Sequence, residues 1–244
     1  MNMQQMLSPF RRAIQDYKMI ESGDKIAVGV SGGKDSLVLL TLLAEYQKYF
    51  DCKFDLMAVT VDMGFTENAY TPIAQYCKQL GIEYSVVKTD IAEIIFDIRK
   101  EKNPCSLCAK MRRGALNSEI TSKGFNKLAL GHHKDDVVET FLLSLFYEGR
   151  LNTFQPKSYM SRSGVTLIRP MIYLAEKDIS GLAKTMPVVH NPCPANKHTE
   201  RESMKQLLAD LSKKYPNLSE KFANAVMHPE RYNLWDSIDT DNKK

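Results

Sequence analysis

The stretch that decides the fold is VGVSGGKDS, residues 28–36. It completes a compact β-rich run, KIAVGV (25–30), and leads into LVLLTLLAEYQKYF (37–50), whose apolar residues recur at helical spacing. A small-residue turn between a strand and a helix points backbone N–H groups outward, and the helix start adds a partial positive charge. The stretch therefore predicts an anion site. Its backbone comes from Val30, Ser31, Gly32 and Gly33.

The side chains of the same loop indicate that the anion is a phosphate that binds together with Mg²⁺. Lys34 and the hydroxyl of Ser36 can bind phosphate, whereas Asp35 is suited to a Mg²⁺ ion that the phosphates also bind. A Walker A loop is excluded, because Val28 stands where its first glycine would be and Asp35 stands in its Ser/Thr place. The G-x-G-x-x-G dinucleotide pattern is absent as well. The plainer alternative is a tight strand–helix turn capped by serine.

Outward from this loop, strand and helix patterns alternate. Further strands are expected at 54–62, 82–89, 126–131 and 165–173, with helices between them. This order predicts an α/β fold with a doubly wound parallel sheet and helices on both faces. We expect an N-terminal helix (1–20), a central domain (21–198) and a C-terminal helical extension with a tail (199–244).

Composition is that of a globular protein. Of 244 residues, 43% are hydrophobic and 25% are charged, which excludes whole-chain disorder. No apolar run is long enough for a membrane span, and the N-terminus lacks the apolar stretch of a secretory signal, so we expect a cytoplasmic protein. The net charge is +4, but residues 97–127 hold eight Lys/Arg against three Asp/Glu. This local excess permits a nucleic-acid partner.

A second motif, LGHHKDDVVET (130–140), opens the helix after the fourth expected strand. The carboxyl ends of parallel strands share one edge of a sheet, so Gly131, His132, Asp135 and Asp136 should face the same crevice as the first loop. The two carboxylates could hold Mg²⁺ or orient a substrate. Helix capping by one of them is the structural alternative.

The five cysteines divide into two groups. Cys52 and Cys77 stand singly and are expected to be structural. Cys105 and Cys108 form a C-x-x-C at a helix start, and Cys193 lies between two prolines. Three thiolates allow a zinc site with a histidine (His190 or His198), a Cys105–Cys108 redox disulfide, or a [4Fe–4S] cluster with one open iron.

Taken together, these motifs resemble a known family. SGGKDS resembles the PP-loop of the N-type ATP pyrophosphatases, and GHHKDD is similar to a motif of tRNA-modifying PP-loop enzymes. CSLCAKMRRGALN (105–117) and RPMIYLAEKDI (169–179) are similar to the TtcA/TtuA group of tRNA thiolases, and most similar to its 2-thiocytidine branch. That branch has two cysteines, P-C-x-x-C, where Cys193 stands alone here, and the zinc fingers of the 2-thiouridine branch are absent.

The resemblance implies an ATP-dependent tRNA sulfurtransferase. ATP would adenylate the C2 carbonyl oxygen of a tRNA pyrimidine, which the likeness to the 2-thiocytidine branch makes a cytidine, and sulfur carried on a [4Fe–4S] cluster would replace it. It also implies a homodimer, and a cysteine desulfurase or sulfide as sulfur donor. A lysidine synthetase, a 2-thiouridine-forming enzyme and a non-catalytic ATP-binding module with structural zinc are the alternatives.

The resemblance assigns roles to individual residues. The cluster would be held by Cys105, Cys108 and Cys193, and Mg²⁺ by Asp35. The catalytic groups would be Asp35, Arg112 and Asp136. ATP would contact Val30, Ser31, Gly32, Gly33, Lys34, Asp35, Ser36, Gly131 and Asp136. Lys110 and Arg113 would bind tRNA phosphates, and Phe65 is expected to pack rather than to stack on a base.

Overall fold

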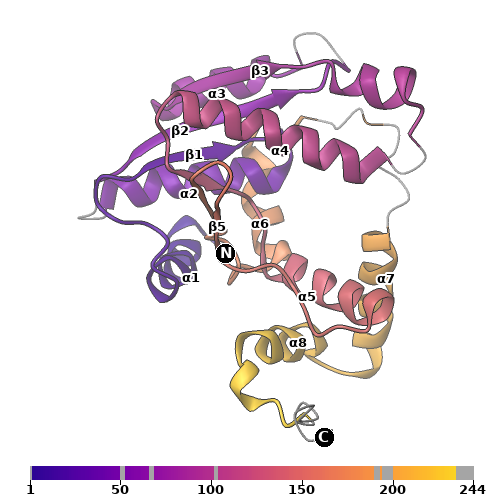
Figure 1. The fold of residues 1–244 in the computed structure, drawn as a ribbon. Coiled ribbons are helices and arrows are strands. Elements are labelled where there is room, and N and C mark those ends of the chain that lie inside the picture. The colour runs from indigo at the N-terminus through magenta and orange to yellow at the C-terminus, as the bar shows by residue number, and fades with distance from the viewer. Residues whose placement is uncertain are drawn as a thin grey trace, which may run out of the picture.

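The computed structural model describes residues 2–49, 53–65, 69–101, 104–189, 193 and 200–234. Their centre is a six-stranded sheet in the order β3-β2-β1-β4-β6-β5 (Figure 1). Every neighbouring pair is parallel except β5 with β6, which is antiparallel. The strands are β1 (Lys25–Gly29), β2 (Asp55–Asp62), β3 (Glu83–Lys88), β4 (Lys127–Ala129), β5 (Lys157–Met160) and β6 (Val165–Ile168).

Helices cover both faces of this sheet, because alternate strand residues are apolar on each side. One face buries Ile26 and Val28 against α1 (Met3–Asp16), α2 (Lys34–Tyr49), α3 (Thr71–Leu80) and α6 (Glu176–Leu182). The other face buries Ala27 against α4 (Pro104–Ser122) and the π-helical turn Glu93–Ile98. The expected doubly wound α/β architecture is confirmed.

A third apolar cluster lies beyond the sheet, at the lower right of Figure 1. There α5 (Lys134–Leu143) packs against α7 (Glu200–Lys214) and α8 (Leu218–Met227). Short 3-10 turns, Ala183–Thr185 and Pro229–Arg231, follow α6 and α8. Among the described residues, no helix combines the length and apolarity that a membrane span requires. The three-part division at residues 20 and 198 stays a prediction.

The structure differs from the expected elements at four places. The strand expected over 165–173 ends at Ile168, because Pro170 lacks an N–H and the chain turns after it. The edge strand β5 was not expected. The helix that the second motif opens ends as α-helix at Leu143 and continues as a π-helical turn, Ser144–Glu148. Between the strand expected at 82–89 and α4, the chain forms a π-helical turn, Glu93–Ile98, and not an α-helix.

The connectivity places one crevice at the centre of the sheet. β1 lies between β2 and β4, and the chain runs outward from β1 in both directions. In open α/β sheets, ligands bind in a crevice at the carboxyl ends of the strands, at the point where the strand order reverses. The loop after β1 is SGGKDS and the loop after β4 is LGHHKDD, so the topology brings both motifs to this crevice.

Candidate functional site

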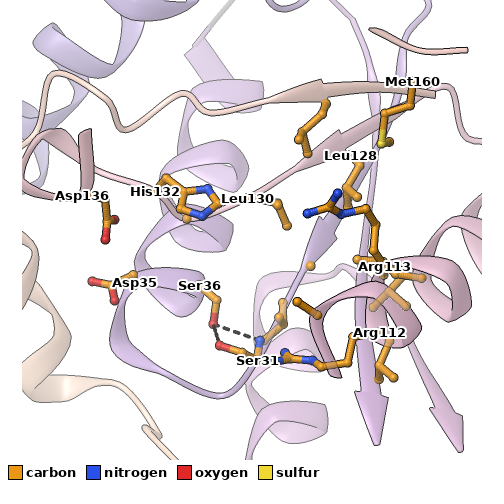
Figure 2. Close-up of a pocket in the computed structure, with 18 residues that line it drawn as sticks. Ser31, Asp35, Ser36, Arg112, Arg113, Leu128, Leu130, His132, Asp136 and Met160 are labelled. Carbon is orange, nitrogen blue, oxygen red and sulfur yellow. Dashed lines mark hydrogen bonds between the residues drawn. The ribbon is translucent and has the colours of Figure 1, made fainter. Parts of the chain in front are cut away.

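A cavity of about 420 Å³ opens at this crevice (Figure 2). Its polar wall comes from the two motifs, and α4 contributes two arginines from the opposite side. Its apolar wall comes from strands and from α4. The expected site residues that line the cavity are Val30, Ser31, Asp35, Ser36, Arg112, Arg113, Gly131 and Asp136, together with His132.

The loop after β1 is held in a tight turn by its own serines. The Ser36 hydroxyl donates to the carbonyl of Gly33 at 2.9 Å and accepts the N–H of Ser31 at 3.2 Å. The Gly33 N–H reaches the Ser31 hydroxyl at 3.3 Å. Gly32 has a φ of +86°, which favours glycine, and its carbonyl accepts the N–H of Val189 at 2.9 Å. The loop and the start of α2 thus form the compact turn that a phosphate site requires.

Gly131 is needed because the two motifs touch through their backbones. A Cβ at this position would lie 2.9 Å from the carbonyl carbon and oxygen of Asp35 and 3.1 Å from the N of Ser36. Real Cβ atoms essentially never approach other atoms so closely. The glycine therefore lets the second motif rest directly on the first.

Two carboxylates of the motifs converge on one buried histidine. The Nε2 atom of His133 lies 3.4 Å from Oδ2 of Asp136 and 3.8 Å from Oδ1 of Asp35. His133 is also the N-cap of α5, and its backbone N–H donates to Oδ2 of Asp136 at 2.9 Å. Helix capping, the structural alternative for this carboxylate, is therefore present. Figure 2 shows Asp35 and Asp136 turned toward the same space.

Lys34 does not line the cavity but joins an ion network beside it. Its ammonium lies 2.9 Å from Asp35 and 3.0 Å from Glu176, and Glu176 also pairs with Lys205 at 2.7 Å. Burial alone would raise the pKa of Glu176, but its bonds to Lys205 and Lys34 prevail and lower it to about 2. Asp135 accepts the backbone N–H of Glu176 at 2.7 Å, so this carboxylate supports the α6 start.

His132 forms a fixed neutral donor at the cavity wall. Nε of Arg169 donates to Nδ1 of His132 at 3.2 Å, so the remaining ring proton lies on Nε2. The ring centroids of Phe154 and His132 lie 4.9 Å apart, and the Arg169 guanidinium lies over the Phe154 ring, 4.7 Å from its centroid. Burial, with help from the Arg169 charge, lowers the pKa of His132 to about 4.

The charges of Cys105 and Cys193 both act on the Cys108 thiol. Burial raises the pKa of the Cys108 thiol, Arg112 opposes this, and the charges of Cys193 and Cys105 raise it further. Cys105 is exposed, in the first turn of α4, and Cys108 contacts the sulfur of Met63 at 3.5 Å. Within the described ranges, no three metal-ligating side chains stand at coordination distance.

The remaining expectations concern the structural cysteines, the Cys105–Cys108 disulfide and the zinc alternative. Cys77 is fully buried and burial raises its pKa to about 11, as expected of a structural thiol. Cys105 and Cys108 are thiols and form no disulfide. Cys52, His190 and His198 lie outside the described residues.

Of the cations on α4, Arg112 and Arg113 line the cavity, whereas Lys110 is exposed on the helix and does not. Phe65 packs against Phe96, with ring centroids 5.9 Å apart, as expected of a packing residue.

Four residues were missed by sequence reasoning: His133, Arg169, Glu176 and Arg201. Arg169 and Glu176 lie in the stretch singled out by resemblance, which was the available signal. Arg201 reaches Asp136, Glu139 and Thr140 from α7, and no local pattern marks it.

Comparison with known proteins agrees with this geometry. Residues 3–208 match the family model described as a PP-loop domain. The chain is 39% identical over 223 residues to the tRNA-cytidine(32) 2-sulfurtransferase of Pseudomonas entomophila, covering 88% of this chain and 80% of that protein. It is 38% identical to the protein of the same name from Pseudomonas syringae pv. syringae, covering 92% and 83%.

A solved structure shares the fold across nearly the whole chain. The U34-tRNA thiolase NcsA from Methanococcus maripaludis with its [4Fe-4S] cluster has a TM-score of 0.75 and 24% identity, covering 96% of this chain and 80% of that one. At this identity the likeness concerns the fold alone. By the matched domain model and the sequence relatives, the chain belongs to the PP-loop family and, within it, to the family of the tRNA-cytidine 2-sulfurtransferases.

Proposed function

We propose that this chain is an ATP-dependent tRNA sulfurtransferase that converts a cytidine to 2-thiocytidine. The observation that carries the proposal is the single cavity lined at once by SGGKDS, GHHKDD and the basic helix that begins with C-x-x-C. The relatives named tRNA-cytidine(32) 2-sulfurtransferase support the same substrate class. A lysidine synthetase would share the first two motifs but has no need of Cys105, Cys108 and Cys193.

The reaction begins at the loop after β1. The turn formed by SGGKDS and the N–H groups at the start of α2 bind the phosphates of ATP. The C2 carbonyl oxygen of the base attacks the α-phosphorus and pyrophosphate leaves. The oxygen, now adenylated, is a good leaving group, and AMP departs when sulfur attacks C2. Arg112 stabilises the negative charge that develops in these steps, since it faces the cavity from α4.

Magnesium fits the carboxylates of the two motifs. Asp35 would hold the ion, and Asp136 would be its second ligand or would orient the substrate, because both oxygens lie within 3.8 Å of the same His133 nitrogen. Carboxylate oxygens are the ligands that Mg²⁺ prefers. The ion would neutralise phosphate charge when bound.

A [4Fe–4S] cluster fits the chemistry of the cysteine set. The charges of Cys105 and Cys193 act on the Cys108 thiol, and three thiolates would leave one iron without a protein ligand. When bound, such a cluster would supply the sulfur that replaces the carbonyl oxygen. Because Cys105 is exposed, a sulfur donor, either a cysteine desulfurase or sulfide, would have access to the cluster site from solvent.

The remaining partners follow from the surface and from the family. Arg113 at the cavity and Lys110 on the same helix would bind tRNA phosphates. A cytoplasmic location suits three thiols that must stay reduced. The homodimer rests on the resemblance alone.

Nucleoside mass spectrometry of tRNA tests the proposal. Deletion of the gene should abolish 2-thiocytidine, and the wild-type chain should restore it. Cys105→Ser should fail to restore it and should lose iron after anaerobic purification, whereas Ser106→Ala, at the exposed neighbouring position, should behave as wild type. Loss of a 2-thiouridine, or stoichiometric zinc in place of iron, would overturn the proposal.

A further inference from the structure

Helix α7, which precedes α8 near the C-terminus, reaches both nucleotide-site motifs. It packs on α5 through Met204 and Leu208, which join the apolar cluster of Val138, Phe141 and Leu142. Arg201 and Lys205 stand one helical turn apart, so they lie on one side of α7. Each extends to a carboxylate of the site network.

Arg201 is bonded to the second motif. Its Nη1 lies 3.0 Å from Oε2 of Glu139 and 3.4 Å from Oδ1 of Asp136, and its Nη2 donates to the Thr140 hydroxyl at 3.0 Å. The other carboxylate oxygen of Asp136 accepts the N–H of His133. Both oxygens of Asp136 are therefore restrained, one by the helix cap and one by α7.

Lys205 is connected to the first motif through two residues. It pairs with Glu176, Glu176 pairs with Lys34, and Lys34 pairs with Asp35. The carboxylate of Glu176 thus pairs with two cations, Lys205 from α7 and Lys34 from the loop after β1. Loss of Lys205 would leave Glu176 to attract Lys34 alone, and would draw that ammonium away from the loop.

We propose that Arg201 and Lys205 are positioning residues, through which α7 sets the relative placement of Asp136 and the Lys34–Asp35 pair for Mg²⁺ and ATP. Neither residue lines the cavity, so both act through the groups they hold. Without Arg201, the buried carboxylate of Glu139 would stand next to Asp136 with no guanidinium between them. This inference rests on the proposed function, because it assumes that the two motifs bind Mg²⁺ and ATP.

The test compares Arg201→Gln, Arg201→Lys and Lys205→Met in the full-length protein. Pyrophosphate release is measured with tRNA while ATP and Mg²⁺ are varied, and thermal unfolding is followed in parallel. Arg201→Gln should raise the half-saturating Mg²⁺ concentration or lower kcat by about 10–100-fold, the usual effect of removing support from a metal ligand. Arg201→Lys should recover part of this loss. Lys205→Met should mainly raise the KM for ATP.

A matched control is on the same helix. Lys213 bonds Asp210 at 2.8 Å, within α7 and away from the cavity, so Lys213→Met should leave all constants unchanged. Unchanged Mg²⁺ and ATP dependence in folded Arg201→Gln and Lys205→Met would overturn the inference, as would losses that only follow the folded fraction. If wild type itself released no pyrophosphate, the proposed function would fail instead.

Discussion

Replacement of Gly131 by alanine tests the contact on which the site is built. The added Cβ would lie 2.9 Å from backbone atoms of Asp35, and ordinary contact begins at 3.4 Å, so the motifs must separate by at least 3.4 − 2.9 = 0.5 Å. Gly131 is not in a positive-φ conformation, so the penalty is steric alone. Overpacking of this kind costs about 1–3 kcal/mol. A 1 Å misplacement can cost about 100-fold in rate, so half of that displacement should cost about tenfold.

Urea unfolding and pyrophosphate release measure the two effects. With a slope of about 3 kcal/mol/M, the unfolding midpoint should fall by roughly 0.3–1 M. The matched control is Gly181→Ala, in α6, where a Cβ meets nothing within 4 Å. That variant should be more stable by about 0.5–1 kcal/mol and fully active. A Gly131→Ala protein with wild-type stability and rate would refute the close approach of the two motifs.

Three further tests concern the charges of the fold, two by substitution and one by titration. Glu176→Gln should destabilise the protein at neutral pH. Because the pKa of Glu176 is depressed in the folded state, the difference in stability from wild type should disappear as the pH falls from about 4.5 to about 2. Urea unfolding midpoints measured across this range would contradict the prediction if the difference stayed constant. Asp24→Asn breaks the buried pair with Lys127 and should cost about 3–5 kcal/mol in unfolding free energy, with the KM for ATP unchanged; a loss below 1 kcal/mol would mean that the pair is solvated. The His132 ring, followed by NMR, should remain neutral down to about pH 4, and titration near 6.5 would show that Arg169 and burial do not control it.

Local patterns in the sequence were sufficient for most of the sheet. KIAVGV and FDLMAVTVD are continuous apolar runs, as buried parallel strands are, and the helix after SGGKDS follows from its spacing. The edge strand β5 was missed because its pattern, KSYM, is short, polar and only partly buried. The strand over 165–173 was drawn too long because apolar Met171 and Ile172 continue the run, although they are buried in a turn.

The site was predicted in its motifs but not in its supports. Asp35 and Asp136 were placed in one crevice because parallel strands end at one edge. Glu176 and Arg201 were not found, since an ion pair between residues far apart in the chain leaves no periodic signal. The tautomer of His132 likewise depends on Arg169, which lies 37 residues away.

The sequence by itself determined the alternation of strands and helices and the tight SGGKDS turn between β1 and α2, because these depend on neighbours within a few residues. Only the tertiary structure decided which charges face one another: His133 between two carboxylates, Lys34 held by Asp35 and Glu176, and α7 bonded to the second motif. The physical reason is how far apart in the chain the interacting residues lie. Backbone conformation is set locally, whereas electrostatic and steric contacts at the crevice are set by the packing of segments that the chain brings together only on folding.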